Sequence, residues 1–333
     1  MLTVRPLALT DADAFSALHG ACDAESVRAL VARSDQAFEG VSGTSMRYVF
    51  SLVSTDAETG QSVLLGAIAL VPRIGLELAR YSFRSGVVVH ASAELNMFNR
   101  ANTLLLANDH TGCAEIGLPI VVQSEWASLH QRNLIESALL YVAEQRACFP
   151  QGILGELPGV CGDSADPPFW TGLGRHFYAG AVPMADAFFP PPQRSHIARL
   201  LPKHPLYSGF IGAPALACLG QAGAAALGAA DTLQAQGFRY RGHVNIFDAG
   251  PIVEADIDDV LSPRYGHVLP VCLDGGDHPQ PLLVAAMGAH RGQAFSVGCL
   301  HASLLNGALC MSPAVARAFG LVQGQVVRVL PPR

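Results

Sequence analysis

Residues 114–146 carry the plainest structural signal in this sequence and read AEIGLPIVVQSEWASLHQRNLIESALLYVAEQR. The first part, Ala114 to Val122, is almost entirely apolar, which predicts a buried strand. From Glu125 to Arg146 the apolar residues recur at helical spacing and form one stripe. The stripe consists of Leu134, Ile135, Ala138, Leu139 and Val142. Since a helix that lies on a sheet needs such a stripe, this segment predicts a strand followed by a long helix packed on the same sheet.

The flanking segments alternate between strand and helix patterns. Strands are predicted at Leu2–Pro6, Arg47–Val53, Ser62–Val71 and Gly152–Leu157, and helices after Thr10 and over Ala24–Phe38. The second and third of these strands flank the polar turn Thr55–Gln61 and so predict an antiparallel hairpin. The order predicts an α/β (α+β) fold in which helices flank a mixed sheet.

Two domains are predicted, one over residues 1–238 and a smaller, β-rich part over residues 239–333. Within the first, residues 158–214 are rich in proline, glycine and aromatic residues, which predicts irregular connections. From Arg239 onward short strands recur between turn residues, notably at Arg239–Phe247, Val268–Leu273 and Gln325–Leu330.

Composition limits the partners of this 333-residue chain. Half of the residues are hydrophobic and the mean hydropathy is +0.31, so an oligomer that buries apolar surface is expected. The net charge of −6 and the lack of a Lys/Arg cluster exclude a nucleic-acid partner. Charged residues interrupt Met1–Phe15, and Ala213–Ala230 is too weakly apolar to span a membrane and predicts a buried helix instead. We therefore expect a cytoplasmic protein without a membrane partner.

The eight cysteines form no C-x-x-C pair and have no histidine at metal-ligand spacing. They are interpreted as reduced core thiols, and no metal site is predicted from the sequence.

Five ordered blocks of sequence resemble the arginine N-succinyltransferase family. They read VHASAEL at Val89–Leu95, NDHTG at Asn108–Gly112, PPFW followed by LGRHFY within Pro167–Tyr178, LPKHPLY at Leu201–Tyr207, and GFRYRGHVNIFDAGP at Gly237–Pro251. The resemblance implies an acyl-CoA N-acyltransferase (GNAT-like) fold and transfer of a succinyl group from succinyl-CoA to the α-amine of arginine or ornithine in arginine catabolism. Succinyl-CoA is then a co-substrate, and no tightly bound cofactor is implied.

The coenzyme loop departs from the pattern of acyl-CoA N-acyltransferases, in which R/Q-x-x-G-x-G/A precedes the long helix and backbone N–H groups hold the pyrophosphate. Residues 123–133 contain no glycine here. We therefore predict that the coenzyme contacts Val122 and Gln123 at the end of the strand and the side chain of Arg132. His130 is a further candidate. The alternative is a non-catalytic partner subunit, since a glycine-free loop also resembles the α-type member of paired succinyltransferases.

The acyl transfer needs a proton acceptor for the attacking amine and groups that hold the substrate. Glu115 is the first candidate for the proton acceptor. The alternative is that the Glu115 side chain only points into solvent at the end of its strand. His90 and His176 are further catalytic candidates, and histidines in packed loops are often structural. The candidates for substrate binding are Glu156, Arg175, Asn108, Asp109 and His204. The alternative for Asn108 and Asp109 is turn formation, and the alternative for Arg175 is a structural ion pair.

Overall fold

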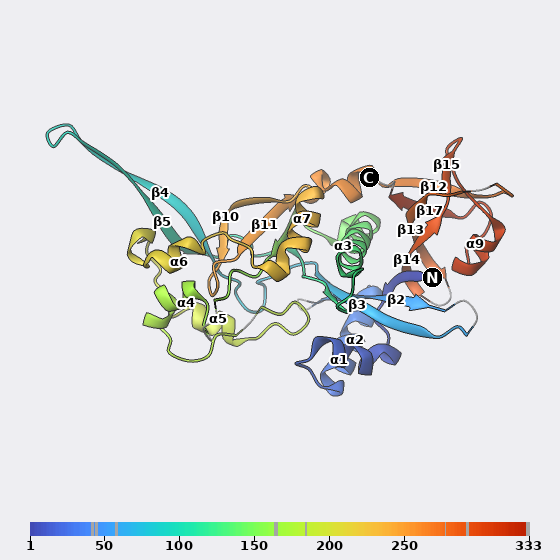
Figure 1. Ribbon diagram of the computed structural model, residues 1–333, viewed down its shortest axis with the longest axis horizontal. Coiled ribbons are helices and arrows are strands. Elements are labelled where there is room, and N and C mark those ends of the chain that lie inside the picture. Colours follow the sequence, from blue (N-terminus) through green and yellow to red (C-terminus); the bar gives the residue numbers. More distant parts are fainter. Residues whose placement is uncertain are drawn as a thin grey trace. The chain divides into compact units, whose positions relative to one another are not determined.

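The computed structural model describes residues 1–40, 43, 46–56, 59–162, 166–183, 185–276, 278–290 and 293–330. Its contacts divide the chain into two compact units, each built from separate stretches of sequence (Figure 1). Unit 1 comprises Met1–Val71, Pro119–Phe149 and Ile257–Arg333, and unit 2 comprises Pro72–Leu118 and Pro150–Asp256. A boundary at residues 238/239 between independently folding domains stays a prediction.

A mixed sheet forms the centre of unit 1. Its strands are β1 (Leu2–Pro6), β2 (Tyr48–Thr55), β3 (Ser62–Val71), β7 (Ile120–Val121), β12 (His267–Leu273), β13 (Pro281–His290), β14 (Gln293–His301), β15 (Ser303–Leu305), β16 (Ala308–Met311) and β17 (Val326–Leu330). They pair in the order β7-β3-β2-β1-β14-β13-β17-β12-β16-β15, and only the β12/β16 pair is parallel among them. Val4 of β1 lies between Leu52 and Val297, so the C-terminal strands extend the N-terminal sheet.

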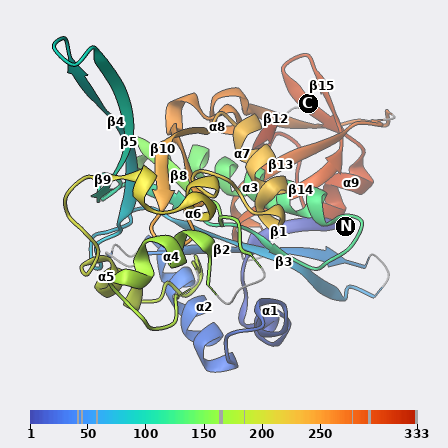
Figure 2. The same ribbon diagram turned by 60° about the vertical axis from the view of Figure 1, so that its left-hand side comes forward.

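Five helices are described in unit 1. They are α1 (Ala12–His19), α2 (Ala24–Phe38), α3 (Ala127–Glu144), α8 (Leu261–Tyr265) and α9 (Pro313–Phe319). Helix α2 begins where the Asp23 side chain accepts a hydrogen bond of 2.8 Å from the Ser26 amide, a standard N-cap. Figure 2 shows α1 and α2 side by side next to β2 and β3.

Helix α3 confirms the predicted stripe, all five residues of which are buried. It begins two residues later and ends two residues earlier than predicted, and residues 146–148 form a 3₁₀ turn instead. Its Tyr141 ring lies 5.3 Å from Phe50 of β2 and 5.0 Å from Phe295 of β14, between ring centroids. Aromatic contacts of this kind contribute stability beyond that of the buried area. Through them α3 packs on β2 and β14, which are far from it and from each other in the sequence.

The single strand predicted over Ala114–Val122 is wrong. The structure has β6 (Ala114–Ile116) and β7, separated by the three residues Gly117, Leu118 and Pro119. Pro119 has no N–H to donate to a ladder, which accounts for the interruption.

A second mixed sheet forms the centre of unit 2. Its strands are β4 (Ser82–Ser92), β5 (Met97–Ala107), β6, β8 (Gly152–Glu156), β9 (Leu206–Tyr207), β10 (Arg239–Asn245) and β11 (Pro251–Asp256). They pair in the order β6-β8-β11-β10-β4-β5-β9, with only β6/β8 parallel among them. The helices are α4 (Pro168–Gly172), α5 (Gln193–Ala198), α6 (Ala213–Ala217) and α7 (Leu227–Ala235).

The proline-rich segment 158–214 supplies much of the core of unit 2. Phe169 and Trp170 of α4 are fully buried, and Trp170 packs on Phe247 with ring centroids 5.2 Å apart. The predicted buried helix over Ala213–Ala230 is wrong, because the structure has the two short helices α6 and α7 there. Gly220, at φ +70°, lies between them in a conformation that no helix contains.

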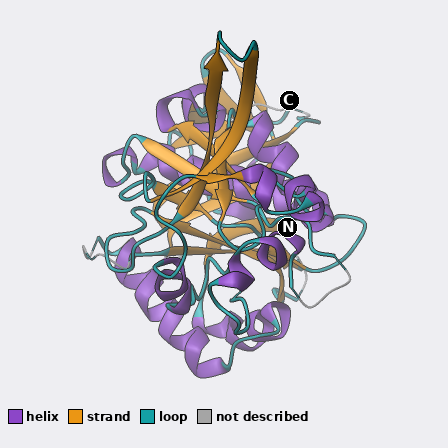
Figure 3. Cartoon of the chain, turned by 90° about the vertical axis from the view of Figure 1, so that its left-hand side faces the viewer, coloured by secondary structure: helices purple, strands orange, loops and turns teal. Residues whose placement is uncertain are grey.

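Strands β4 and β5 form a two-stranded arm that runs out from unit 2 (Figures 1 and 3). Their register runs from Ser82 opposite Ala107 to Ser92 opposite Met97. Most side chains beyond Phe83 on β4 are exposed, so the outer arm has no core of its own within this chain.

Candidate active site

Parallel strands β6 and β8 bring two predicted carboxylates together. Glu115 lies opposite Leu154 in the ladder, and Glu156 ends β8 two residues further on. Both side chains are buried, at 7% and 8% exposed. Buried carboxylates need partners, so their surroundings define the chemistry available at this end of the sheet.

Three side chains from distant segments of the chain donate hydrogen bonds to these carboxylates. Arg80 Nη2 lies 2.6 Å from Glu115 Oε1 and also pairs with Glu156 Oε2. Arg194 of α5 places Nη2 2.6 Å from Glu156 Oε1, and the Asn245 side-chain amide donates to the same oxygen. We call Arg80, Glu115, Glu156, Arg194 and Asn245 the carboxylate cluster.

Charge is balanced within the carboxylate cluster, since its two guanidinium groups face two carboxylates. Burial lowers the pKa of Arg194, while the charges of Glu115 and Asp248 act in the opposite direction. Because a guanidinium stays protonated in proteins, Arg194 depends on these carboxylates for compensation. Its guanidinium also lies 5.0 Å from the centroid of the Phe247 ring.

The turn that follows β10 fixes Asn245 in place. Its Oδ1 accepts a 2.6 Å hydrogen bond from the Phe247 amide, while Nδ2 faces Glu156. Further along the turn, a Cβ on Gly250 would lie 2.1 Å from Leu157 O, so only glycine permits this approach. The turn and the end of β8 are thereby held against each other, which sets the position of Glu156.

A second group of titratable side chains lies elsewhere in unit 2. His243 of β10 places Nδ1 2.7 Å from Glu254 Oε1 of β11, and His110 Nε2 lies 3.2 Å from the same oxygen. Burial works to raise the pKa of Glu254, but the two adjacent imidazoles outweigh it and hold the pKa at about 2. We call His110, His243 and Glu254 the histidine cluster.

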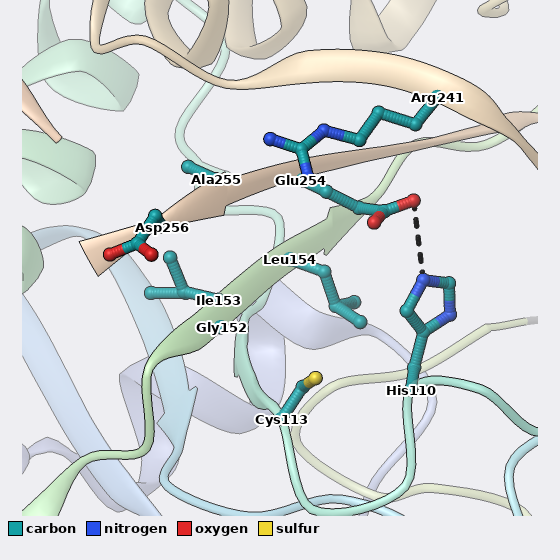
Figure 4. A pocket seen from close by; sticks show the side chains of 9 residues that line it. All are labelled: His110, Cys113, Gly152, Ile153, Leu154, Arg241, Glu254, Ala255 and Asp256. Carbon is teal, nitrogen blue, oxygen red and sulfur yellow. Dashed lines mark ion pairs between the residues drawn. The ribbon is translucent and has the colours of Figure 1, made fainter. Parts of the chain in front are cut away.

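A pocket of about 130 Å³ adjoins the histidine cluster (Figure 4). Its lining residues are His110, Cys113, Gly152, Ile153, Leu154, Arg241, Glu254, Ala255 and Asp256. Burial raises the pKa of the Cys113 thiol, with the charge of Glu254 as a second cause, so this cysteine is a thiol rather than a nucleophilic thiolate.

The predicted coenzyme residues lie in unit 1, around the start of α3. Val122 donates its amide to Leu65 O at 2.8 Å, and Val122 and Gln123 are exposed. Arg132 is half exposed and places Nε 3.1 Å from Glu136 Oε1. His130 is buried and burial lowers its pKa, so it is a neutral imidazole inside the protein rather than a surface cation.

The remaining predicted residues are spread over unit 2. His90, His176 and His204 are exposed, and Nε2 of His90 on strand β4 lies 3.2 Å from the hydroxyl of Tyr207 on strand β9. Arg175 pairs with Asp166 and donates to the carbonyl of Ala179.

The Asn108–Asp109 turn has contacts of its own. Asn108 O accepts from the Thr111 hydroxyl at 2.8 Å, and Asp109 Oδ2 lies 3.1 Å from Arg84 Nη1. Of the predicted site residues in unit 2, only Glu115 and Glu156 are joined through a common partner in the described part of the chain.

Sequence reasoning missed Arg80, Arg194, His243, Asn245 and Glu254. His243 and Asn245 stand inside the last of the five sequence blocks, which is the signal that was available for them. Arg80 lies in an irregular segment and Arg194 in the six-residue helix α5, and neither is long enough or periodic enough to indicate what these side chains face.

Comparison with known proteins identifies the family. The family described as arginine N-succinyltransferase beta subunit matches residues 2–262. This chain belongs to the arginine N-succinyltransferase family. It is 36% identical over 272 residues to an arginine N-succinyltransferase of Salmonella schwarzengrund, covering 80% of this chain and 76% of the relative. It is 32% identical over 283 residues to one of Yersinia enterocolitica, covering 85% and 81%.

A solved structure extends the likeness beyond the matched residues. The arginine/ornithine succinyltransferase subunit AI from Pseudomonas aeruginosa aligns with a TM-score of 0.79 at 27% identity, over 99% of this chain and 98% of that one. The predicted class, a mixed sheet flanked by helices, and the predicted family are confirmed. Within the described residues, no helix has the length and apolar character that crossing a bilayer requires.

Proposed function

We propose that this chain transfers a succinyl group from succinyl-CoA to the α-amine of arginine or ornithine in arginine catabolism. The observation that carries the proposal is the family match over residues 2–262, which spans both α3 and every residue of the carboxylate cluster. Relatives that bear the name arginine N-succinyltransferase support it.

In this reaction the neutral amine attacks the thioester carbonyl, the carbon–sulfur bond breaks, and CoA leaves as a thiol. The substrate's ammonium group must first lose a proton. We assign Glu115 as the acceptor of that proton, with Glu156 holding the cationic end of the substrate. Glu156 already binds the guanidinium groups of Arg80 and Arg194, so its carboxylate suits the guanidinium that arginine carries, and a substrate has to displace one of these two side chains to bind there.

The other predicted contacts stay part of the proposal. His90 and His176 remain catalytic candidates, and His204, Asn108, Asp109 and Arg175 remain candidates for substrate binding. Their described contacts with Tyr207, Arg84, His243 and Asp166 fit a structural role as well. Alanine variants of each, assayed for KM and kcat, separate the two roles.

For the coenzyme, we assign the first turn of α3 together with Val122, Gln123 and Arg132. A helix start offers backbone N–H groups that lack intrahelical partners, and α3 has neither a side-chain cap nor an acidic residue in its first turn. The Arg132 guanidinium is half exposed and is bound to one carboxylate. Because this side chain is not buried, it can rotate to contact a phosphate of the coenzyme without a change in the core.

The test is a titration of the purified chain with succinyl-CoA, followed by calorimetry and by tryptophan fluorescence. Only two tryptophans exist, of which Trp170 is buried and Trp126 is 57% exposed just before α3. Binding at α3 should change the Trp126 emission, and the signal should vanish in Trp126→Phe. Loss of one charge-assisted contact in Arg132→Ala should weaken binding about 10-fold, whereas the exposed Arg317→Ala should not. Unchanged affinity in Arg132→Ala would remove Arg132 from the coenzyme site.

A second candidate function is that of a non-catalytic subunit that supports an active companion. The absence of glycine from residues 123–133 favours it, since side chains there hinder close approach of phosphates. Under this proposal the chain alone binds no succinyl-CoA, activity appears on mixing with the companion, and Glu115→Gln in this chain leaves that activity unchanged.

We also propose that the chain forms an oligomer and is located in the cytoplasm. The exposed apolar residues of the arm support a homo-oligomer or a hetero-oligomer with a companion subunit. All eight cysteines lie in the described part of the chain as free thiols, which supports a reducing, cytoplasmic location.

A further inference from the structure

We propose that His110, His243 and Glu254 bind one zinc ion within unit 2. The three proposed ligands are separate from Glu115 and Glu156, and the inference does not rest on the proposed function. Two imidazoles and one carboxylate form a donor set that zinc takes in proteins. The residues come from the turn after β5 and from strands β10 and β11, so their spacing in the sequence gives no metal-binding pattern.

The donor atoms already lie at distances close to those that a zinc ion imposes. One donor atom from each of the three residues lies within 4.8 Å of the other two. With bonds of about 2.0–2.2 Å, neighbouring ligand atoms in a tetrahedral site are roughly 3.3–3.5 Å apart. Glu254 Oε1 lies 3.2 Å from His110 Nε2 and 2.7 Å from His243 Nδ1. Of these two distances the second must lengthen, which a small rotation of one side chain allows, and the donor nitrogens of the two imidazoles lie within 4.8 Å of each other.

His110 supplies an independent observation. Its side chain is 6% exposed, and its Nε2 atom is buried without a hydrogen bond of acceptable geometry. Glu254 Oε1 lies 3.2 Å from this nitrogen and forms an ion pair with it, but no hydrogen bond joins the two atoms. A buried polar nitrogen that makes no hydrogen bond is unfavourable, and a metal ion in this position would give it a ligand bond.

The surroundings of His243 match those of a zinc-bound histidine. While Nδ1 faces Glu254, Nε2 on the other side of the ring lies 3.4 Å from Asp109 Oδ2. Zinc-bound histidines commonly direct their second ring nitrogen to a carboxylate, which fixes the ring orientation. Asp109 is in turn held by Arg84 at 3.1 Å.

The charges also suit a divalent cation. The carboxylate of Glu254 lies beside both imidazoles and supplies the negative charge of the site. The pocket in Figure 4 reaches both His110 and Glu254 and leaves space for a water molecule as the fourth ligand. Cys113 lines the pocket but does not belong to the group of potential ligands.

Zinc in this position would join the turn after β5 to strands β10 and β11. Its expected effect is therefore on the stability of unit 2, because a ligand that binds only the folded state stabilises it. Addition of zinc should raise the unfolding temperature of the chelator-treated chain.

The test uses the full-length chain without a histidine tag, dialysed against chelator and titrated with zinc chloride by calorimetry. We expect one zinc per chain, with affinity reduced about 100-fold in His110→Asn and in His243→Asn. The exposed His267→Asn is the matched control and should bind as the parent does. Equal binding in all three variants, or a folded parent chain that takes up no zinc, would overturn the proposal.

X-ray absorption at the zinc edge of the parent chain decides the ligands even if a variant fails to fold. Nitrogen and oxygen neighbours that include imidazoles are expected. A spectrum dominated by sulfur would assign the ion to cysteines and reject the site.

Discussion

Arg80 donates to Glu115, with Nη2 2.6 Å from Oε1, and the same guanidinium also pairs with Glu156. One arginine from an irregular segment thus connects the ends of two parallel strands. Since both carboxylates are buried, the guanidinium groups beside them provide the compensating charge. The carboxylate cluster is therefore a structural element as well as the proposed site of proton transfer, and experiments must separate the two roles.

Replacing Arg80 by methionine should strongly destabilise the chain, because it leaves two buried carboxylates short of one positive partner. Breaking a buried ion pair by removal of one partner costs about 3–5 kcal/mol. Urea unfolding of Arg80→Met measures this loss in the free energy of unfolding. Arg264→Met is the matched control, since Arg264 and Asp259 are exposed and 3.8 Å apart, and its cost should be about 0–1 kcal/mol. Equal costs for the two variants would show that the buried pairs contribute no more than surface pairs.

Glu115→Gln should lower kcat about 100-fold or more while the chain stays folded, because an amide of the same shape cannot accept the substrate's proton. The assay is release of CoA thiol from succinyl-CoA with arginine, together with a melting curve to verify folding. Glu156→Gln should mainly raise KM for the amino acid. The exposed Glu39→Gln is the control for both. If kcat in Glu115→Gln equals that of the parent, Glu115 acts only as an ion-pair partner.

Local patterns predicted the long helix α3 and the strand β8 that follows it, but not the interrupted strand before the helix. The stripe of α3 and the apolar run of β3 arise from neighbours in the sequence, so the bounds of these two elements agree with prediction to within two residues. The break at Pro119 and the separation of α6 from α7 near Gly220 depend on single residues that override a favourable pattern.

The candidate site was predictable only in part. Glu115 and Glu156 could be found because each lies on a predicted strand. Their partners Arg80 and Arg194 could not, because long-range packing rather than sequence spacing brings them to these strands. The histidine cluster was missed for the same reason, since its third member lies on a different strand from His243.

The arm should mediate self-association. Val87, Val89 and Phe98 lie on one face of the β4–β5 ladder, and they are 50%, 52% and 70% exposed. The residues opposite Val87 and Val89 on this face are Asn102 and Arg100, so the face combines exposed apolar and polar side chains, as subunit interfaces do. Phe98→Asp should shift the chain toward the monomer, as measured by analytical ultracentrifugation over a range of concentrations. Val322→Asp, which changes an apolar residue that is 63% exposed away from the arm, should not. An unchanged sedimentation profile for Phe98→Asp would exclude the arm from the interface.

His130 should make stability depend on pH in the mildly acidic range. Burial lowers its pKa below the ordinary value of 6.5, so the unfolded chain takes up a proton more readily than the folded chain. The contribution of this residue to stability is therefore complete above pH 6.5 and is lost as the pH falls through the lower folded pKa. Substitution by a neutral side chain of similar size, His130→Gln, should flatten the decline of the unfolding free energy over this range. Urea unfolding at several pH values measures the slope, with the exposed His204→Gln as the control. A slope in His130→Gln as steep as in the parent would mean that another group causes the acid sensitivity.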